Sequence, residues 1–243
     1  MIQKFITMTK KSVFYLSLMI LILTSGNDIT AQSALKSVKT KPVQVESFKH
    51  TDIGNPAIVG TVTVLKNGFD ITAGGADIWG VKDEFNFIYV ERNGDFDIIS
   101  RIESLSATHL YTKAGLMARE DLTPGCRHIY FQAFPNNDLR NKNNGGYEFQ
   151  YRAAKDGDMK AIYPKSAAGI PEFPVAYPDT WIRLRRVKND FTGYYSADGK
   201  KWKVYTTFTL ELPTKIYLGL AVTSHNASEK ATAKFRNIEE IAH

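Results

Sequence analysis

Apolar and polar residues alternate with a period of two through nearly every segment from Phe48 onward. In "TVTVLKNGFDITA" (61–73), for example, Val62 and Val64 fall on one face of an extended chain. Successive side chains of a β-strand point to opposite faces, so this period is typical of strands and not of helices. The pattern predicts an all-β fold, with no helix outside the first 31 residues.

Three glycine dipeptides divide alternating segments: Asn67-Gly68, Asn93-Gly94 and Asp198-Gly199. Such dipeptides supply the positive φ angles of tight hairpins, and we expect a hairpin at each. Further strands are expected at residues 114–120, 127–134, 147–152, 181–187, 215–223 and 231–238. About a dozen short antiparallel strands must cover their apolar faces in two packed sheets or in a closed barrel, and we expect two sheets.

The first 31 residues have the order of a secretory signal peptide. Lysines precede an apolar run at 13–23, and small and polar residues follow it to Ala31. The run is too short for a membrane span, which needs ~20 residues. A lipoprotein would require a cysteine close behind this run, and the segment that follows the run has none. We therefore expect cleavage after residue 31 and an exported protein, periplasmic or extracellular, that is not a lipoprotein and has no membrane span.

Residues 32–46 lack a lasting period and are expected to form a leader or linker, and residues 47–243 a single β-domain. The net charge is +6, or +4 without the signal peptide, and basic residues do not cluster. This excludes a typical nucleic-acid-binding protein. Cys126 is the only cysteine, which excludes an internal disulfide and a cysteine-based zinc site. We expect it to be a small buried residue.

Eight short motifs, in order, resemble a known family. They are "TDIGNP" (51–56), "GGADIWG" (74–80), "GDFDIISRI" (94–102), "YTKAGLMARE" (111–120), "YEFQYRA" (147–153), "WIRLRRV" (181–187), "YYSADGKKW" (194–202) and "YLGLAVTSHN" (217–226). The set resembles the concanavalin-A-like modules that are appended to secreted glycoside hydrolases and are related to the C-terminal domain of β-xylosidases. The resemblance implies a jelly-roll β-sandwich of two curved antiparallel sheets and an association with carbohydrates. It implies no established catalytic residues.

Alternation places polar side chains together on three of the expected strands. In the strand at 114–120, Arg119 shares a face with Met117. In the strand at 147–152, Gln150 and Arg152 share a face. In the strand at 181–187, Trp181 and Arg183 share a face. Sugars are bound by hydrogen-bonding groups around their hydroxyls and by an aromatic ring under their apolar face. If the strands are neighbours, one sheet has a glycan-binding face. The alternative is a solvated face with cross-strand ion pairs.

Two other segments contain candidate ligand groups. His225 and Asn226 follow an apolar strand and either bind a ligand hydroxyl at the edge of the face or cap a turn. "GGADIWGVKDEF" (74–85) has the composition of a connection between sheets. We expect Trp79 to cover the edge of the core there; the alternative is a stacking platform for a sugar, with Asp77 bonding to its hydroxyls.

Catalysis and calcium are further alternatives. Glu120 and Glu148 are the acids near the expected face, and a glycosidase needs two carboxyls about 5 Å or about 6.5–9.5 Å apart. No metal-site residues are assigned, but a structural calcium could use the acid pairs Asp95/Asp97 or Asp156/Asp158. The leading hypothesis is an exported protein that binds a polysaccharide or oligosaccharide without a cofactor. The alternatives are a glycoside hydrolase and a non-catalytic envelope protein that binds a protein partner.

Overall fold

The computed structural model describes residues 39–136, 145–163 and 171–242. The expected signal peptide, residues 32–38 of the expected linker, and residues 137–144 and 164–170 lie outside these residues. Contacts divide the chain into Met1–Ser37 and Val38–His243, and the following description concerns the second unit.

One eight-stranded antiparallel sheet, sheet A, has the order β15-β14-β13-β8-β17-β4-β3, with β1 paired to β17. Its strands are β1 (Thr40–Pro42), β3 (Thr61–Leu65), β4 (Gly68–Ala73), β8 (Phe96–Leu105), β13 (Thr180–Val187), β14 (Asp190–Ser196), β15 (Lys203–Thr209) and β17 (Ala231–Ile241).

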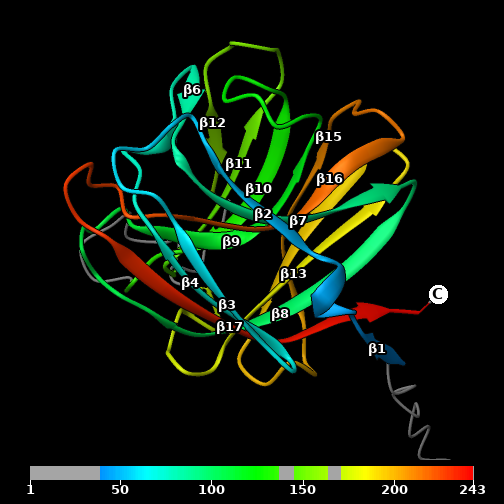
Figure 1. The fold of residues 1–243 in the computed structure, drawn as a ribbon. Helices are drawn as coiled ribbons and strands as arrows, with labels where there is room; N and C mark the ends of the chain where they lie inside the picture. Colours follow the sequence, from blue (N-terminus) through cyan, green and yellow to red (C-terminus); the bar gives the residue numbers. More distant parts are fainter. Residues whose placement is uncertain (1–38, 137–144, 164–170, 243) are drawn as a thin grey trace, which may run out of the picture. The chain divides into compact units, whose positions relative to one another are not determined.

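The seven-stranded sheet B has the order β12-β11-β10-β9-β16-β7-β2 and is also antiparallel. Its strands are β2 (Lys49–Ile53), β7 (Phe85–Asn93), β9 (Lys113–Arg119), β10 (His128–Ala133), β11 (Tyr147–Arg152), β12 (Lys160–Ile162) and β16 (Lys215–Thr223). A hairpin of β5 (Ile78–Trp79) and β6 (Lys82–Asp83) and a 3-10 turn (Val45–Ser47) complete the fold (Figure 1).

The main hydrophobic core lies between the two sheets. Its members include Ile182 and Phe235 of sheet A and Leu116, Phe131 and Leu220 of sheet B, all fully buried. The expected all-β sandwich of two antiparallel sheets is therefore confirmed.

The outer faces of the two sheets differ. In β13, buried and partly exposed residues alternate, as expected for a strand with one solvated face. Every residue of β9 and β10 is buried, so both faces of sheet B are covered at its centre. A second apolar cluster, which includes Phe87, Met117 and Tyr130, lies on the outer face of sheet B. This covered face is where the candidate site forms.

Most predicted strands are confirmed. The ranges 147–152 and 215–223 match β11 and β16, and β17 extends the predicted 231–238 by three residues to Ile241. The hairpin at Asp198-Gly199 joins β14 and β15, and Gly199 has a φ of 68°. No helix in the described part of the chain is long and apolar enough to cross a membrane.

The other two turn predictions need correction. Asn93-Gly94 joins β7 of sheet B to β8 of sheet A, so it is a crossing between sheets and not a hairpin. A hairpin does join β3 and β4, but its turn is Lys66-Asn67, and Gly68 pairs with Leu65 inside the ladder. Close packing explains this glycine, because a Cβ atom at Gly68 would lie 2.0 Å from the Phe235 carbonyl oxygen.

Candidate functional site

The segment 74–84 connects β4 of sheet A to β7 of sheet B and covers part of the outer face of sheet B. Ile78 is fully buried in the apolar cluster on that face. Gly75 has a φ of +112°, and a Cβ atom there would lie 2.1 Å from the Glu84 carbonyl oxygen. The predicted connection between sheets is thus confirmed, and the glycine is required by both conformation and space.

Asp83 anchors this segment through a buried ion pair. Arg152 donates to both carboxylate oxygens, at 2.8 Å from Nη1 and 2.7 Å from Nη2. Arg119 Nη2 lies 4.0 Å and His128 Nδ1 3.7 Å from Asp83 Oδ2, and all four side chains are fully buried. Arg119 and Arg152 do share a face of sheet B, as predicted, but they hold the covering segment in place. Their expected role in binding a glycan is not supported by this geometry, because neither reaches the surface.

His128 is neutral in this cluster at ordinary pH. Burial is the main cause, and the guanidinium groups of Arg119 and Arg152 add to it; together they outweigh Asp83 and lower the pKa of His128 to about 4. The Nδ1 atom lies 3.1 Å from the Cys126 carbonyl oxygen, which fixes it as the donor. Cys126 itself is buried, as predicted.

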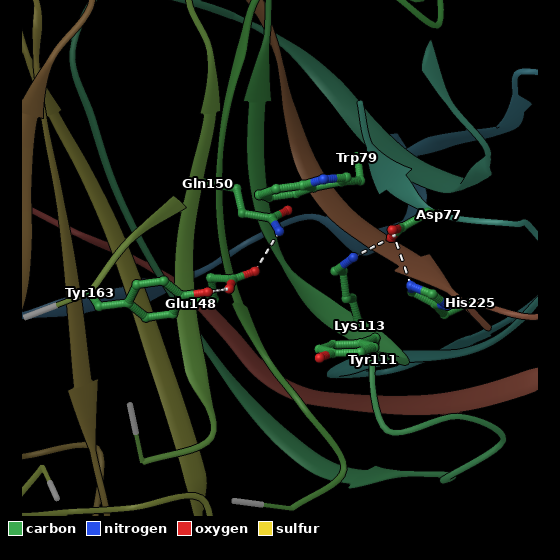
Figure 2. Close-up of a pocket in the computed structure, with 8 residues that line it drawn as sticks. All are labelled: Asp77, Trp79, Tyr111, Lys113, Glu148, Gln150, Tyr163 and His225. Atoms are coloured by element: carbon green, nitrogen blue, oxygen red, sulfur yellow. Dashed lines mark hydrogen bonds and ion pairs between the residues drawn. The ribbon is translucent and has the colours of Figure 1, made fainter. Parts of the chain in front are cut away.

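Beside the covered part of the sheet, a pocket of about 320 Å³ remains open. Eight residues line it: Asp77, Trp79, Tyr111, Lys113, Glu148, Gln150, Tyr163 and His225 (Figure 2). Asp77 and Trp79 come from the segment 74–84, and Lys113, Glu148 and Gln150 from strands β9 and β11. The pocket therefore has a rigid polar floor of strand residues and a wall supplied by the covering segment.

Asp77 is the centre of one polar network on the pocket wall. It accepts hydrogen bonds from the Lys113 ammonium group and the Ile78 amide, and His225 Nε2 lies 3.1 Å away (Figure 2). Burial by itself would raise the pKa of the Asp77 carboxyl. The hydrogen bond from His225 and the charge of Lys113 outweigh burial, and the pKa lies below its ordinary value. Asp77 is thus a carboxylate that orients a lysine and a histidine.

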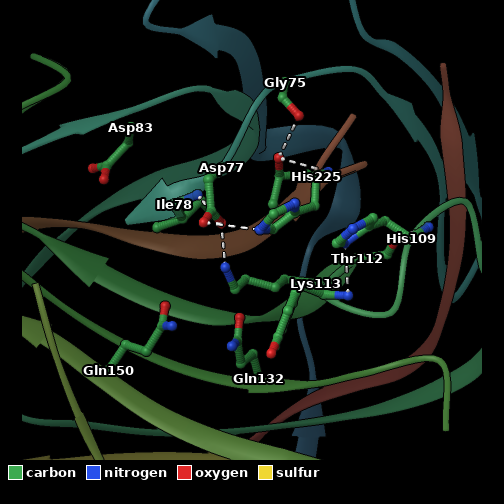
Figure 3. Close-up of polar contacts among 12 residues, drawn as sticks. Gly75, Asp77, Ile78, Asp83, His109, Thr112, Lys113, Gln132, Gln150 and His225 are labelled. Carbon is green, nitrogen blue, oxygen red and sulfur yellow. Dashed lines mark hydrogen bonds and ion pairs between the residues drawn. The ribbon is translucent and has the colours of Figure 1, made fainter. Parts of the chain in front are cut away.

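Glu148 is the centre of a second network on the opposite side of the pocket (Figure 2). Its Oε1 atom accepts from Gln132 Nε2 at 3.1 Å and from Gln150 Nε2 at 2.5 Å, and its Oε2 atom accepts from the Tyr163 hydroxyl. These bonds fix the orientation of both amides, because only an NH₂ group can donate to a carboxylate. Gln132 Oε1 and Gln150 Oε1 are buried and have no hydrogen-bond partner within the described ranges (Figure 3).

Aromatic rings form the rim of the pocket. Trp79, Tyr111 and Tyr163 line it and are 42%, 40% and 38% exposed. The His225 and His109 rings stack nearby, with centroids 4.4 Å apart and planes 6° apart. The expectation that Trp79 covers the core edge is wrong, because its ring is exposed at the pocket; the alternative of a platform for a ring-shaped ligand fits its position.

Two predicted site residues lie on the other sheet. Trp181 and Arg183 belong to β13 of sheet A, while Arg119 and Gln150 belong to sheet B. Arg183 pairs with Asp97 through two contacts of 2.6 Å and packs over the Tyr194 ring. The prediction of one sheet face with all three strands is wrong, because β8 and β14 flank β13 in place of β9 or β11.

Asn226 caps a turn, which is the alternative to its expected role in binding a ligand hydroxyl. Its side-chain oxygen accepts from the Ser228 amide at 3.0 Å and from the Ser228 hydroxyl at 2.9 Å. His225, by contrast, faces the pocket with a φ of 55°. The adjacent residues therefore divide the two roles that the sequence left open.

Glu120 and Glu148 do not form a pair. Glu120 accepts two hydrogen bonds from Arg127, which lower the pKa of its carboxyl. In the register of sheet B, Arg119 and Arg152 align with the same residue, His128. Glu148 lies four residues before Arg152, about 13 Å along the strand, and Glu120 lies beyond Arg119 in the other direction. Their separation exceeds the range of a glycosidase pair, about 5–9.5 Å.

The acid pairs considered for calcium have other contacts. Asp97 pairs with Arg183, and Asp95 accepts from the Lys188 amide at 2.7 Å. Across the described ranges, no group of three or more His, Cys, Asp or Glu side chains could hold a metal ion. A structural calcium at Asp156 and Asp158 stays a prediction.

The sequence analysis missed four residues of the site: Tyr111, Lys113, Gln132 and Tyr163. Strand alternation contained a signal for Lys113, because it lies on the same face as Arg119, and for Gln132, which is opposite Glu148. The two tyrosines come from outside the strands, and only the tertiary structure shows their position at the pocket.

No family model and no curated protein sequence matches the chain. Solved structures do match it. A functionally unknown protein from Saccharomyces cerevisiae is 13% identical, with a TM-score of 0.60 over 83% of this chain and 99% of that one. The exoplasmic/lumenal domain of VIP36, in a Ca²⁺/Man3GlcNAc-bound form, is 14% identical, with a TM-score of 0.50 over 83% of this chain and 86% of that one.

The GH43 protein BlXynB from Bacillus licheniformis, solved as a K247S mutant, is 12% identical, with a TM-score of 0.52 over 72% of this chain and 33% of that one. At these identities the similarity concerns the fold. With its two large antiparallel sheets, the chain has a concanavalin-A-like jelly-roll fold, shared with the exoplasmic/lumenal domain of VIP36 and with part of the GH43 protein BlXynB.

Proposed function

We propose that this protein is an exported carbohydrate-binding protein and that the pocket on the outer face of sheet B holds a saccharide unit. The observation that carries the proposal is the combination, in one pocket, of exposed aromatic rings with buried polar groups on fixed strands. The apolar face of a pyranose stacks on an aromatic ring, while its hydroxyls need donors and acceptors in fixed directions.

The two parts of the pocket have complementary roles in this proposal. Trp79 provides the stacking surface, and Gln150, Glu148 and Lys113 meet the hydroxyls. The pocket volume of about 320 Å³ suits one or two sugar rings, at the lower end of the range for small-molecule sites, ~300–1,000 Å³. The name of the VIP36 structure records a bound saccharide on the same fold, which adds support at the level of the fold alone. Export is proposed from the signal-peptide pattern of residues 1–31.

The test is a binding screen of residues 32–243 against a panel of glycans and polysaccharides, with reducing-end release measured in the same wells. We expect binding to at least one glycan, and Trp79→Ala to weaken it tenfold or more. Trp202→Ala is the matched control, because Trp202 lies near Arg183 on the other sheet. Equal losses from both variants, or no binding to any glycan, would contradict the proposal.

Glycoside hydrolysis is a second candidate, favoured by one observation: two carboxylates, Asp77 and Glu148, line the same pocket. Hydrolysis requires one carboxyl that donates a proton and a second that acts as base or nucleophile. Both oxygens of Glu148 already accept hydrogen bonds, and Asp77 is paired with Lys113. These contacts favour binding over proton donation. Release of reducing ends, abolished by Glu148→Gln, would instead establish the hydrolase.

A further inference from the structure

From the amide pair Gln132 and Gln150, we infer the ligand class: the floor of the pocket recognises an uncharged sugar through hydroxyl groups that donate hydrogen bonds, and it rejects a sulfate or carboxylate at that position. This inference rests on the proposed function and names the chemistry of its ligand.

The amide orientations carry the argument. Gln132 and Gln150 both direct their NH₂ groups to the same oxygen of Glu148, at 3.1 and 2.5 Å. Rotating either amide would bring its carbonyl oxygen against the carboxylate, and two acceptors repel each other. The two amides are therefore fixed in the orientation in which neither Oε1 atom meets Glu148.

These two oxygens need donors. Both glutamines are fully buried, and neither Oε1 atom has a hydrogen-bond partner within the described ranges. A buried acceptor without a partner is unfavourable, so a ligand that supplies donors gains binding energy. Gln150 lines the pocket, and Gln132 lies on the neighbouring strand β10 (Figure 3). A sugar hydroxyl is a donor of suitable size, whereas a sulfate ester or an ionised carboxylate is only an acceptor.

The charges around the floor act in the same direction. Glu148 is a carboxylate that already binds both amides, and an anionic ligand group would meet it together with two carbonyl oxygens. Lys113 is nearly fully buried, and its ammonium group donates to Asp77. An anionic sugar would have to compete with Asp77 for this lysine.

The experiment compares neutral polysaccharides with their sulfated forms. The probes are a β-glucan, a xylan, a mannan and a galactan, each with a chemically sulfated form of the same length. Binding is measured at about 0.3 M salt, which limits surface charge effects to a few ångströms. We expect at least one neutral form to bind tenfold or more tightly than its sulfated form. Monodeoxy or O-methyl analogues of its sugar, in which one hydroxyl can no longer donate, then identify the recognised group by a loss of roughly tenfold.

Variants connect this preference to the amide pair. Gln150→Met keeps the length of the side chain and removes the acceptor, and we expect roughly tenfold weaker binding of the neutral form. Gln44→Met, at an exposed position, is the matched control and leaves binding unchanged. If Gln150→Met does not fold, the ratio of neutral to sulfated binding and the deoxy analogues of the wild-type protein still decide the question.

The outcomes separate this inference from the proposed function. Sulfated forms that bind as tightly as neutral ones, with both weakened by Trp79→Ala, would overturn the inference and leave carbohydrate binding in place. Failure of every neutral and sulfated form to bind would overturn both. A neutral preference that Gln150→Met abolishes supports both.

Discussion

Arg152 and Asp83 form a two-point ion pair with both side chains fully buried, although 68 residues of chain separate them. Asp83 belongs to the segment that covers sheet B, and Arg152 ends strand β11 of that sheet. The pair therefore fastens the segment that supplies Asp77 and Trp79 to the strand that supplies Glu148 and Gln150. The shape of the pocket depends on this attachment.

Removing the Asp83 charge is expected to destabilise the protein strongly. Asp83→Asn leaves the guanidinium groups of Arg152 and Arg119 buried without their anion, which typically costs about 3–5 kcal/mol. The measurement is the free energy of unfolding by chemical denaturation at pH 7. Glu91→Gln is the matched control, because Glu91 pairs with Lys215 at the surface with both side chains about half exposed, and solvent screens such pairs so that they contribute little to stability. Equal effects of the two substitutions would contradict the structural role of Asp83.

His128 is expected to make stability depend on pH. Its folded pKa of about 4 lies below its ordinary value of 6.5, so the unfolded chain binds a proton in the interval where the folded protein does not. The contribution of neutral His128 to the free energy of unfolding is therefore fully present above pH 6.5, and it is lost as the pH decreases toward 4. The loss is about 3 kcal/mol when the shift is converted to free energy.

The pH dependence is tested by comparing unfolding free energies at pH 7 and pH 4.5. His128→Gln should remove much of the loss that the wild-type protein shows over this interval. His50→Gln, at an exposed position of β2, should retain the full wild-type loss. An unchanged pH dependence in His128→Gln would show that other groups cause it.

Arg183 is expected to have no role in binding at the pocket. It lies on sheet A and pairs with Asp97, whereas every described strand residue of the pocket belongs to sheet B or to the β5–β6 hairpin. Arg183→Ala should leave glycan affinity within twofold of the wild-type value, while Trp79→Ala reduces it tenfold or more. Isothermal titration with the best glycan from the screen measures both. A large loss in Arg183→Ala would move the binding site to the outer face of sheet A.

Gly75 is expected to tolerate no side chain. An alanine there would adopt a φ of +112° and place its Cβ 2.1 Å from the Glu84 carbonyl oxygen, so both backbone strain and a backbone clash oppose it. We expect Gly75→Ala to lower the free energy of unfolding by more than about 2 kcal/mol.

Gly94→Ala is the control for Gly75. Gly94 also has a positive φ, 72°, but nothing lies within 4 Å of a Cβ atom there, so strain alone should cost about 1 kcal/mol. Similar losses in thermal or chemical unfolding for the two variants would contradict the packing at Gly75.

The alternation of apolar and polar residues was enough to predict the fold class and most strands, because it is a local property that the pleat of a strand imposes. It predicted β11 and β16 to the residue, and it placed Gln150 and Arg152 on one strand face. It also identified "GGADIWGVKDEF" as a connection between sheets, since glycines and adjacent acids interrupt the alternation there.

The neighbours of each strand became known from the folded molecule alone, because strand pairing joins residues far apart in the chain and leaves no local signal. Strand pairing places Trp181 and Arg183 on sheet A, and the segment that contains Asp83 buries Arg119 and Arg152 on sheet B. The pocket likewise depends on contacts between segments that are far apart in the chain. Tyr111, Tyr163 and Trp79 come from segments whose local sequence does not say where they fold, and the packing of those segments against sheet B brings the three rings around Glu148 and the buried amides.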